Sequence, residues 1–464
     1  MKVIILAGGR GTRLWPMSRK SYAKQFLPLF GGHSLLEGAV NRALAVVGPE
    51  DVITVTNRDY YFYVKDALQS SAAEAVANII CEPEGRNTAP AIALAVQYAV
   101  EKMGAAMDET VFVFPSDHVI APVDKFVSYL HTADQAARAG HLVTFGVHPT
   151  RPETGYGYVQ VGEEHDGYAM CRRFTEKPTV DVAAEYIASG VYLWNAGMFA
   201  FTPVVFRKAL GDYAPDIAAV SAKGYDSALE HWSDMPGISI DYAVMEKATN
   251  VAVVPMDLTW SDVGSWDSYY DLQKKDTEGN VLQGDTHVID THDSLVVSGK
   301  RLVAAVGLSN VTVIETDDAV LVTRRGDGQE VKQLLQTLEN QHRSEATEHT
   351  EIIRPWGRYR VLEVGSRYKI KSIVVNVGAT LSLQRHMHRT EHWVVIRGVA
   401  QVTIGEKTFL VHEGESTFVP KSILHRLGNP GKVPLEIIEV SNGEYVGEDD
   451  IERIEDSYGR ADHE

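Results

Sequence analysis

The chain has 464 residues, which is enough for about three domains. Hydrophobic residues make up 44% of the chain and charged residues 23%, values that exclude a wholly disordered, collagen-like or coiled-coil protein. The formal net charge of −18 argues against non-specific binding to nucleic acid or to anionic membranes, while a local basic pocket for phosphates stays compatible with it.

The cysteine content and the N-terminus indicate the compartment. Two cysteines, Cys81 and Cys171, in so long a chain exclude a disulfide scaffold and favour a reducing environment. No apolar run approaches the ~20 residues needed to span a bilayer, and the first residues lack the regions of a signal peptide. We therefore expect a cytoplasmic enzyme with no nucleic-acid or membrane partner, assembled as a homodimer or a higher homo-oligomer.

Short runs that are apolar at every position alternate with helix-like segments through residues 1–275. The first run, at 3–7, ends in a glycine turn, and further runs lie at 52–56, 111–114 and 142–146. Runs of this kind are typical of strands buried on both faces of a parallel sheet. Because alanine-rich helical stretches separate them, the pattern predicts βαβ units and an open α/β sheet.

The pattern of apolar residues changes after residue 275. Between 280 and 323, short pairs of Val, Ile or Leu are separated by turn residues, which predicts a small β element, with a stacked coil of parallel strands as one candidate. Residues 330–343 form an amphipathic pattern that predicts a helix. From 352 onward, alternating segments bounded by glycine turns predict a small β-barrel or jelly roll, followed by an acidic tail that we expect to be solvated or to pack against a partner.

The glycine turn after the first strand has the character of a phosphate cradle. The segment GGRGTR (8–13) lacks the third glycine of the dinucleotide fingerprint and the Gly-Lys-Ser/Thr of a P-loop. Its glycines let the backbone approach an anion, and Arg10 and Arg13 add cationic donors. A glycine turn alone is structural at least as often as functional, but WPMSR (15–19) and KQFLPL (24–29) follow it here and favour a functional interpretation.

With these motifs the chain resembles the sugar-phosphate nucleotidyltransferases, and among them the long bacterial mannose-1-phosphate guanylyltransferases, which are often bifunctional with mannose-6-phosphate isomerase. The family commonly has proline before the signature lysine, whereas this chain has Ala23, a change that we expect to loosen the loop without removing a functional group. Further matches are EPEGRNTAPA (82–91), FPSDHVI (114–120), TGYGYV (154–159), FTEKP (174–178), WNAGMF (194–199) and WSDVGSW (260–266).

The resemblance implies a fold of class α/β with three parts. These are an N-terminal Rossmann-like nucleotidyltransferase domain (1–275), a short β connector with a linker helix (276–345), for which a left-handed β-helix is one candidate, and a C-terminal cupin β-barrel (346–464).

The resemblance also implies the reaction. A phosphate oxygen of mannose 1-phosphate attacks the α-phosphorus of GTP, which gives GDP-mannose and expels pyrophosphate. Because two polyanions must meet, the site needs cations and a metal more than it needs a nucleophilic side chain. We assign Arg13 and Lys24 to the triphosphate, and Lys177, in FTEKP, to the phosphate of the sugar.

Asp117 and Asp262 are the expected Mg²⁺ ligands. Each lies at or just past a probable strand end, at 111–114 and 251–254, where open α/β sheets place their ligands. Mg²⁺ favours a few carboxylates together with phosphate oxygens, so two distant aspartates suffice. The alternative is that each aspartate is only a turn or cap residue.

The resemblance also assigns base, ribose and sugar recognition. Asn87 and Thr88 can equally be helix caps, and Trp194 and Phe199 are expected to pack the sheet rather than to stack on the sugar. The expected nucleotide-binding residues are Gly8, Gly9, Gly11, Thr12, Glu82, Arg86, Asn87 and Thr88. The expected sugar-binding residues are Tyr156, Gly157, Glu176, Asn195 and Gly197.

The segment QRHMHRTEHW (384–393) concentrates ligand-type side chains. On a strand, positions 384, 386 and 388 share one face, a turn can bring Glu391 back toward them, and a histidine about thirty residues later can complete the site. The spacing resembles the cupin motifs, with glutamine first as in phosphomannose isomerases. The expected metal ligands are therefore Gln384, His386, Glu391 and His425, with His388 as the substitute if the register differs. A mixed N/O set of this kind fits Zn²⁺, Co²⁺, Mn²⁺ or Fe²⁺.

This second site implies interconversion of mannose 6-phosphate and fructose 6-phosphate, and the resemblance makes Arg389 and His392 essential to it. The sequence is compatible with three functions. The first is the bifunctional enzyme, and the second is a guanylyltransferase alone, acting on mannose or a manno-heptose 1-phosphate, with a structural cupin. The third is a non-catalytic nucleotide- or sugar-binding regulator, against which the intact cations and aspartates argue.

Overall fold

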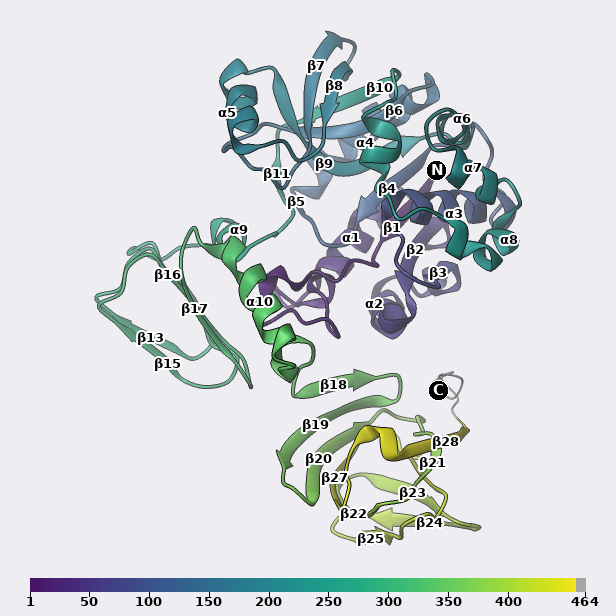
Figure 1. Cartoon of the computed structure of the whole chain (residues 1–464), viewed down its shortest axis with the longest axis vertical. Coiled ribbons are helices and arrows are strands. Elements are labelled where there is room, and N and C mark those ends of the chain that lie inside the picture. Colours follow the sequence, from purple (N-terminus) through teal and green to yellow (C-terminus); the bar gives the residue numbers. More distant parts are fainter. Residues whose placement is uncertain (456–464) are drawn as a thin grey trace. The chain divides into compact units, whose positions relative to one another are not determined.

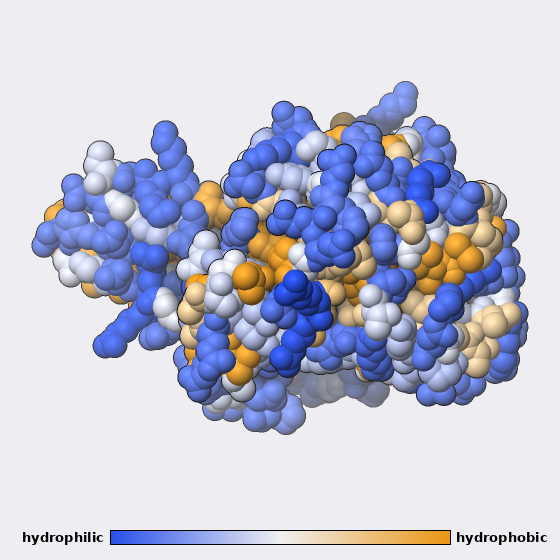
Figure 2. Space-filling view, turned by 90° about the horizontal axis from the view of Figure 1, so that it is seen from above, coloured by the Kyte–Doolittle hydropathy of each residue, from blue (hydrophilic) through white to orange (hydrophobic). Residues whose placement is uncertain are grey.

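The structure is a computed structural model that describes residues 1–455 (Figure 1). It contains two compact units, which are described separately below: the first covers Met1–Thr347 and the second begins at Glu348. None of the helices within residues 1–455 has the length and apolar character of a membrane span. Polar and charged residues cover most of the face seen in Figure 2, with apolar residues in smaller patches between them.

A nine-stranded sheet is the centre of the first unit. Strand β1 pairs in parallel with β2 and β4, whereas β9 runs antiparallel to both β4 and β6. In sheet order the strands are β3 (Ile79–Glu82), β2 (Val52–Asn57), β1 (Lys2–Leu6), β4 (Val111–Pro115), β9 (Tyr192–Phe201), β6 (Leu142–Val147), β10 (Val251–Met256), β8 (Ala169–Thr175) and β7 (Tyr158–Glu164).

Helices cover both faces of this sheet, as the continuous apolar runs predicted (Figure 1). In β1, Ile4 belongs to the core on one face, and Val3 and Ile5 belong to the core on the other. The helices are α1 (Leu35–Leu44), α2 (Tyr61–Ser71) and α4 (Val123–Arg138) on the side of Val3, and α3 (Thr88–Glu101), α6 (Pro203–Tyr213), α7 (Pro215–Ser221) and α8 (Tyr225–Glu230) on the side of Ile4. Helix α5 (Val180–Ser189) packs beside β9.

The first unit also contains a stack of short strands after α9 (Trp266–Leu272). The stack has two ladders, which match the predicted coil of parallel strands: β12–β14–β16 and β13–β15 pair in parallel, and β17 closes the first ladder antiparallel. Helix α10 (Val331–Asn340) follows, as expected. The strands are β12 (Val281–Gln283), β13 (Thr286–Ile289), β14 (Leu295–Val297), β15 (Val303–Val306), β16 (Val311–Glu315) and β17 (Val320–Arg324).

This strand stack shares a hydrophobic core with residues 14–29, which follow the glycine turn and are called the signature loop below. Trp15 donates its indole N–H to the carbonyl of Glu345, at 2.8 Å, and Trp266 of α9 donates to the carbonyl of Trp15, at 2.8 Å. The fully buried Arg19 forms an ion pair of 2.7 Å with Asp318 of the stack. The segment 276–345, which the sequence suggested as a connector, therefore packs against this loop.

The second unit is a β-barrel of two sheets around one apolar core. The first sheet contains β18 (Glu351–Arg354), β19 (Gly357–Val364), β20 (Tyr368–Val375), β27 (Leu435–Gly443), β22 (Arg389–Arg397) and β25 (Ser416–Val419). The second contains β24 (Lys407–His412), β23 (Val399–Ile404), β26 (His425–Gly428), β21 (Leu383–His386) and β28 (Ile451–Glu455). Part of the acidic tail belongs to the barrel, because β28 pairs with β21; residues 456–464 of the tail lie outside the described residues.

Candidate active sites

Two short strands bring the predicted Mg²⁺ aspartates of the first unit together. Strand β5 (Val119–Ala121) pairs antiparallel with β11 (Thr259–Ser261), and Val119 lies opposite Ser261. Asp117 lies just before β5 and Asp262 just after β11, so both lie at the same end of this ladder. The sequence had placed Asp262 behind the strand at 251–254, but it is the additional short strand that positions it.

Lys24 joins the two aspartate segments. Its ammonium nitrogen lies 2.9 Å from Oδ2 of Asp117 and also donates to the carbonyl oxygens of Asp262 and, at 3.4 Å, Val263. Burial opposes ionisation of Asp117, but the charge of Lys24 keeps the pKa of this carboxyl below its usual value. The lysine begins η2 (Lys24–Phe26) and is buried. Its ammonium group thus connects the carboxylate of Asp117 to the backbone of Asp262.

The turn after Asp262 is strained in a way that fixes the carboxylate. Val263 has φ +47°, an unusual value for a β-branched residue. The backbone N–H of Gly264 donates to Oδ1 of Asp262 at 3.0 Å, and the hydroxyl of Tyr156 donates to the same atom at 2.6 Å. The ammonium group of Lys24 is thus surrounded by carboxylate and carbonyl oxygens of Asp117 and Asp262. Oxygen atoms of these two kinds are also the ligands that a hard ion such as Mg²⁺ prefers.

The glycine turn lies against the same lysine. Gly11 has φ +48°, and a Cβ atom on it would lie 2.7 Å from Cβ of Lys24, so both its conformation and its surroundings require glycine. The side-chain amide of Gln25 donates to the carbonyl of Gly9 at 2.8 Å and thereby holds the turn in place. Thr12 starts η1 (Thr12–Leu14), which carries the exposed side chain of Arg13.

Glu82 is a buried carboxyl beside this turn. It ends β3, and a Cβ atom on Gly8 would lie 3.2 Å from its Oε2. Within residues 1–455, Oε1 of Glu82 is buried without a hydrogen-bond partner. Burial raises the pKa of Glu82 to about 8. An acceptor of this kind, next to a phosphate cradle, is suited to the N–H groups of a nucleobase.

The next predicted nucleotide-binding residues are engaged by the protein. Asn87 is the N-cap of α3, and its side-chain oxygen accepts the N–H of Thr88 at 2.8 Å. The hydroxyl of Thr88 accepts the N–H of Ile240 at 2.9 Å. Arg86 forms an ion pair with Glu84 and donates to the carbonyl of Met235 at 2.6 Å, which connects it to the segment that follows α8. The capping alternative is thus realised for Asn87.

Most of the predicted sugar-binding residues do converge. The side-chain oxygen of Asn195 accepts from Thr144 at 2.7 Å and from the N–H of Gly197 at 3.1 Å. Gly157 lies against Glu176, since a Cβ atom would be 2.5 Å from Oε2 of that carboxylate. Glu176 in turn pairs with Lys177 at 2.8 Å, a lysine that is half-exposed and has φ +47°. Tyr156 instead contacts Asp262.

Asp241 is a member of this group that the sequence analysis missed. Its Oδ1 accepts the amide N–H of Asn195 at 3.0 Å, and it begins the π-helical turn η7 (Asp241–Met245). Burial, followed by the charge of Glu176, raises its pKa to about 7. A single aspartate in an irregular segment gives no periodic signal in the sequence, so only the fold shows its position.

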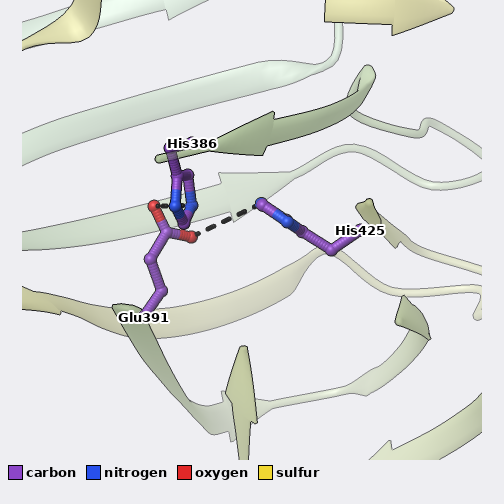
Figure 3. Close-up of side chains that lie close together, drawn as sticks. All are labelled: His386, Glu391 and His425. Carbon is purple, nitrogen blue, oxygen red and sulfur yellow. Dashed lines mark ion pairs between the residues drawn. The ribbon is translucent and has the colours of Figure 1, made fainter. Parts of the chain in front are cut away.

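In the second unit, His386, Glu391 and His425 form a buried cluster whose donor atoms lie within 4.8 Å of one another (Figure 3). They come from β21, β22 and β26. Nε2 of His386 lies 3.0 Å from Oε1 of Glu391, and Nε2 of His425 lies 3.9 Å from Oε2. The figure shows both imidazole rings turned toward the carboxylate. Three of the four predicted ligands are therefore brought together.

The hydrogen bonds of the two histidines suit a metal ion. Nδ1 of His386 lies 2.9 Å from the carbonyl oxygen of Arg389, and Nδ1 of His425 lies 2.9 Å from that of Ile423. Because a carbonyl only accepts, both Nδ1 atoms carry the hydrogen and both Nε2 atoms present a lone pair to the Glu391 carboxylate. Three acceptors facing one another call for a cation between them, and backbone carbonyls commonly orient ligand histidines in this way.

The other predicted residues of this site have different positions. Gln384 lies opposite His425 in the ladder of β21 and β26, so its side chain is on the same face as the cluster. His388, the substitute ligand, is exposed and bonds to Asp450 at 2.7 Å, outside the cluster. His392 is exposed on the opposite face of β22, against Phe418, so the structure does not bring it to the cluster.

Arg389 does lie at the cluster. It is buried, with Nε 3.2 Å from Oε1 of Glu391 and with NH1 donating to the carbonyl of Gly447 at 2.7 Å. Burial opposes ionisation of Glu391, but the contact with His386, followed by the neighbouring His425 and the charge of Arg389, holds its pKa far below the usual range. The carboxylate is therefore ionised and ready to bind a cation.

Comparison with known proteins gives the family. A model described as nucleotidyl transferase matches residues 2–279, one described as a MannoseP isomerase/GMP-like beta-helix domain matches 276–338, and one described as mannose-6-phosphate isomerase C-terminal matches 341–456. Xanthan biosynthesis protein XanB from Xanthomonas campestris pv. campestris is 47% identical over 467 residues, which cover 98% of each chain.

Two further comparisons agree. A mannose-1-phosphate guanylyltransferase from Escherichia coli is 43% identical and aligns with 98% of this chain and 99% of its own. A solved structure described as mannose-1-phosphate geranyltransferase from Thermus thermophilus has 36% identity and a TM-score of 0.67, over 73% of this chain and 99% of that one. The chain therefore belongs to the nucleotidyl transferase family, among the members that also carry a β-helix and a mannose-6-phosphate isomerase C-terminal domain.

Proposed function

We propose that the first unit is a guanylyltransferase that forms GDP-mannose and pyrophosphate from GTP and α-D-mannose 1-phosphate. The observation that carries this proposal is the ammonium group of Lys24, bound between Asp117 and Asp262 beside the glycine turn. It supports a site in which cations and oxygen ligands gather around a phosphate chain, as the transfer of a nucleotidyl group requires.

Different residues of the site bind different parts of the two substrates. In its ionised form Glu82 accepts the N1–H and N2–H of guanine, groups that adenine does not offer, and these two donors favour the ionised form against the effect of burial. The turned backbone and Arg13 hold the triphosphate. On the other side, Asn195, Glu176 and Asp241 bond the hydroxyls of mannose, and Lys177 neutralises the phosphate that attacks.

Asp117 and Asp262 would hold Mg²⁺, which, when bound, neutralises charge on the phosphate oxygens of both substrates. Lys24 lies beside the glycine turn, where its charge would stabilise the triphosphate. Lys177 aligns the attacking oxygen opposite the leaving pyrophosphate. No side chain is required to form a covalent bond, because positioning and charge carry the reaction.

A direct assay tests this function. Purified chain, Mg²⁺ and mannose 1-phosphate should release pyrophosphate with GTP and much less with ATP. A manno-heptose 1-phosphate in place of mannose 1-phosphate tests the sugar. The absence of pyrophosphate release with every pair would favour a nucleotide- or sugar-binding regulator instead.

The second unit supports a second function, the interconversion of mannose 6-phosphate and fructose 6-phosphate. The observation that carries it is the pair of buried Nε2 lone pairs on His386 and His425 facing Glu391. These residues, with Gln384 on the same face, would hold a divalent metal such as Zn²⁺ or Co²⁺, which polarises the carbonyl and hydroxyl oxygens of the sugar when bound. Isomerisation that is lost with a chelator and restored by metal tests it; an inactive chain would indicate a structural barrel.

Assembly and location complete the proposal. We infer a homodimer or a higher homo-oligomer in the cytoplasm, where GTP and sugar phosphates are supplied. Sedimentation of the purified chain measures the assembly.

A further inference from the structure

The inner face of the barrel has an apolar end and a charged end. Strand β20 turns Ile373 and Val375 into the apolar core, and the residues two and four positions before Ile373 on the same face are lysines. The same change occurs on β27 and β22. The charged end is formed by Lys369, Lys371, Arg389, Glu391, Glu439 and Ser441.

The strand register places these side chains in a row beside the metal cluster. Lys369 lies opposite Ser441, and Ser441 lies opposite Glu391, so the three follow one another across β20, β27 and β22. Neighbouring strands are about 4.8 Å apart, which puts Lys369 roughly 10 Å from Glu391 along the backbone row. A hexose 6-phosphate has its reacting carbons at one end and its phosphate at the other. Its length suits a metal at Glu391 and cations at the far end of this row.

The cations of this row are bound by the C-terminal segment, and Lys371 also pairs with Glu439, whose Oε1 lies 3.5 Å from its Nζ. Oε1 of Glu448, in η10 (Glu448–Asp450), lies 2.8 Å from Nζ of Lys371 and 3.2 Å from Nζ of Lys369. The preceding carbonyl, of Gly447, accepts from Arg389 at 2.7 Å. Burial opposes ionisation of Glu448, but Lys371 and then Lys369 lower its pKa to about 2. Three cations thus converge on one carboxylate and one carbonyl.

The cluster behind them is closed to solvent. The side chains of His386, Glu391 and His425 are 0%, 2% and 1% exposed, so a sugar reaches them only if part of the chain moves. The side chain of Glu448 is 46% exposed, and ion pairs rather than apolar contacts hold it at the charged end. Because Glu448 is held there by its charge and its side chain is half-exposed, residues 447–448 are the part of this wall that an anion of higher charge can displace.

We propose that Lys369, Lys371 and Arg389 form a subsite for the phosphate monoester of a hexose 6-phosphate, and that Glu448 with the carbonyl of Gly447 fills it as a built-in competitor. The proposal rests on the isomerase function of the second unit. A phosphate carries close to two negative charges at neutral pH and has three terminal oxygens, so it can serve both lysines and the arginine at once. Displacement of Glu448 by the substrate then opens the path to the metal cluster.

The binding of inorganic phosphate and of mannose 6-phosphate to the full chain tests the subsite. Because Glu448 competes, Glu448→Gln should bind both about five- to tenfold more tightly in calorimetry. Glu444→Gln is the matched control, since it removes a carboxylate of the same segment that pairs outside the barrel with Arg367. Lys369→Met should weaken both about tenfold, because it loses a charge-assisted hydrogen bond, and Lys407→Met, on the exposed strand β24, should not.

The outcomes separate the subsite from the isomerase function. Phosphate sites elsewhere in the chain are the same in all variants. Differences in phosphate affinity between the variants therefore come from the barrel. Altered phosphate binding in a chain without isomerase activity would overturn the isomerase function and leave the subsite standing. Isomerisation with the same KM in all variants, or weaker phosphate binding by folded Glu448→Gln, would overturn the subsite. Thermal unfolding of each variant verifies the fold.

Discussion

Tyr156 donates its hydroxyl hydrogen to Oδ1 of Asp262 over 2.6 Å. The N–H of Gly264 donates to the same oxygen, so two donors set the direction of this carboxylate. The tyrosine ring is itself held edge-on by Trp194 and Trp260, each with ring centroids 5.2 Å away. The residue that the sequence assigned to the sugar therefore orients a proposed metal ligand.

Tyr156→Phe should weaken Mg²⁺ binding more than sugar binding. A hydrogen bond to a charged group is worth about 1.5–3 kcal/mol, so we expect the Mg²⁺ concentration for half-maximal pyrophosphate release to rise about tenfold or more. The KM for mannose 1-phosphate should change little. Tyr192→Phe, which alters a tyrosine stacked on Tyr186 away from the aspartates, is the control. A raised sugar KM with unchanged Mg²⁺ dependence would place Tyr156 at the sugar after all.

Gly11→Ala should disrupt the glycine turn, whereas Gly9→Ala should not. Alanine at φ +48° is strained by about 1 kcal/mol, and its Cβ atom would collide with Lys24. A Cβ atom on Gly9 meets nothing within 4 Å. We expect a lower unfolding temperature for Gly11→Ala only, measured by calorimetry. Equal stability of the two variants would contradict the proposed contact.

Glu82→Gln should change how stability depends on pH. Burial raises the pKa of Glu82 to about 8, compared with about 4.3 in an unfolded chain. The folded chain thus holds a proton that the unfolded chain releases, and the free energy of unfolding falls as pH rises between these values. Glutamine has no such proton, so the variant should gain stability relative to the unaltered chain from about pH 5 to about pH 8. Thermal unfolding at several pH values measures this, with the exposed Glu84→Gln as the control.

His386→Ala should abolish isomerisation and metal binding while guanylyl transfer continues. It removes one ligand of the buried cluster, whereas His388→Ala removes an exposed histidine outside it. Metal content by elemental analysis and both activities should be measured on the two variants. Unchanged metal content in His386→Ala would refute the assigned ligand set.

Lys177→Ala should have the converse effect, because it removes the cation proposed for the sugar-linked phosphate of the first unit. We expect pyrophosphate release to fall by about a hundredfold or more, as for the loss of a group that stabilises transition-state charge. Isomerase activity should stay the same. Lys208→Ala, an exposed lysine on α6, is the control. Equal loss of both activities in a folded chain would argue against separate sites.

The sequence predicted the parts of the fold in which one pattern repeats. Apolar runs predicted the buried strands, and glycine turns with alternation predicted the barrel. It did not predict β11, which is three residues long, or the pairing of β28 in the acidic tail. Short strands and polar strands have too few apolar positions to give a period. Their positions depend on partners far away in the chain.

The candidate sites show the same division. His386, Glu391 and His425 were predictable because their spacing follows a known motif. The twofold alternation of a strand also decides His392: if Glu391 points inward on β22, its neighbour points outward. The alternation ends after His386, where the chain bends, and this removes His388 from the cluster. No alternation rule applies to Asp241 or Tyr156, which long-range packing brings to their sites.

Trp15 and Arg19 of the signature loop, together with the α9 tryptophan, contact the segment that contains the strand stack. These contacts decide where the chain can be truncated. A fragment that stops near residue 275 would expose the underside of that loop and leave the guanidinium of Arg19 without its carboxylate from Asp318. The smallest autonomous transferase fragment of this chain therefore extends through α10 to about residue 347.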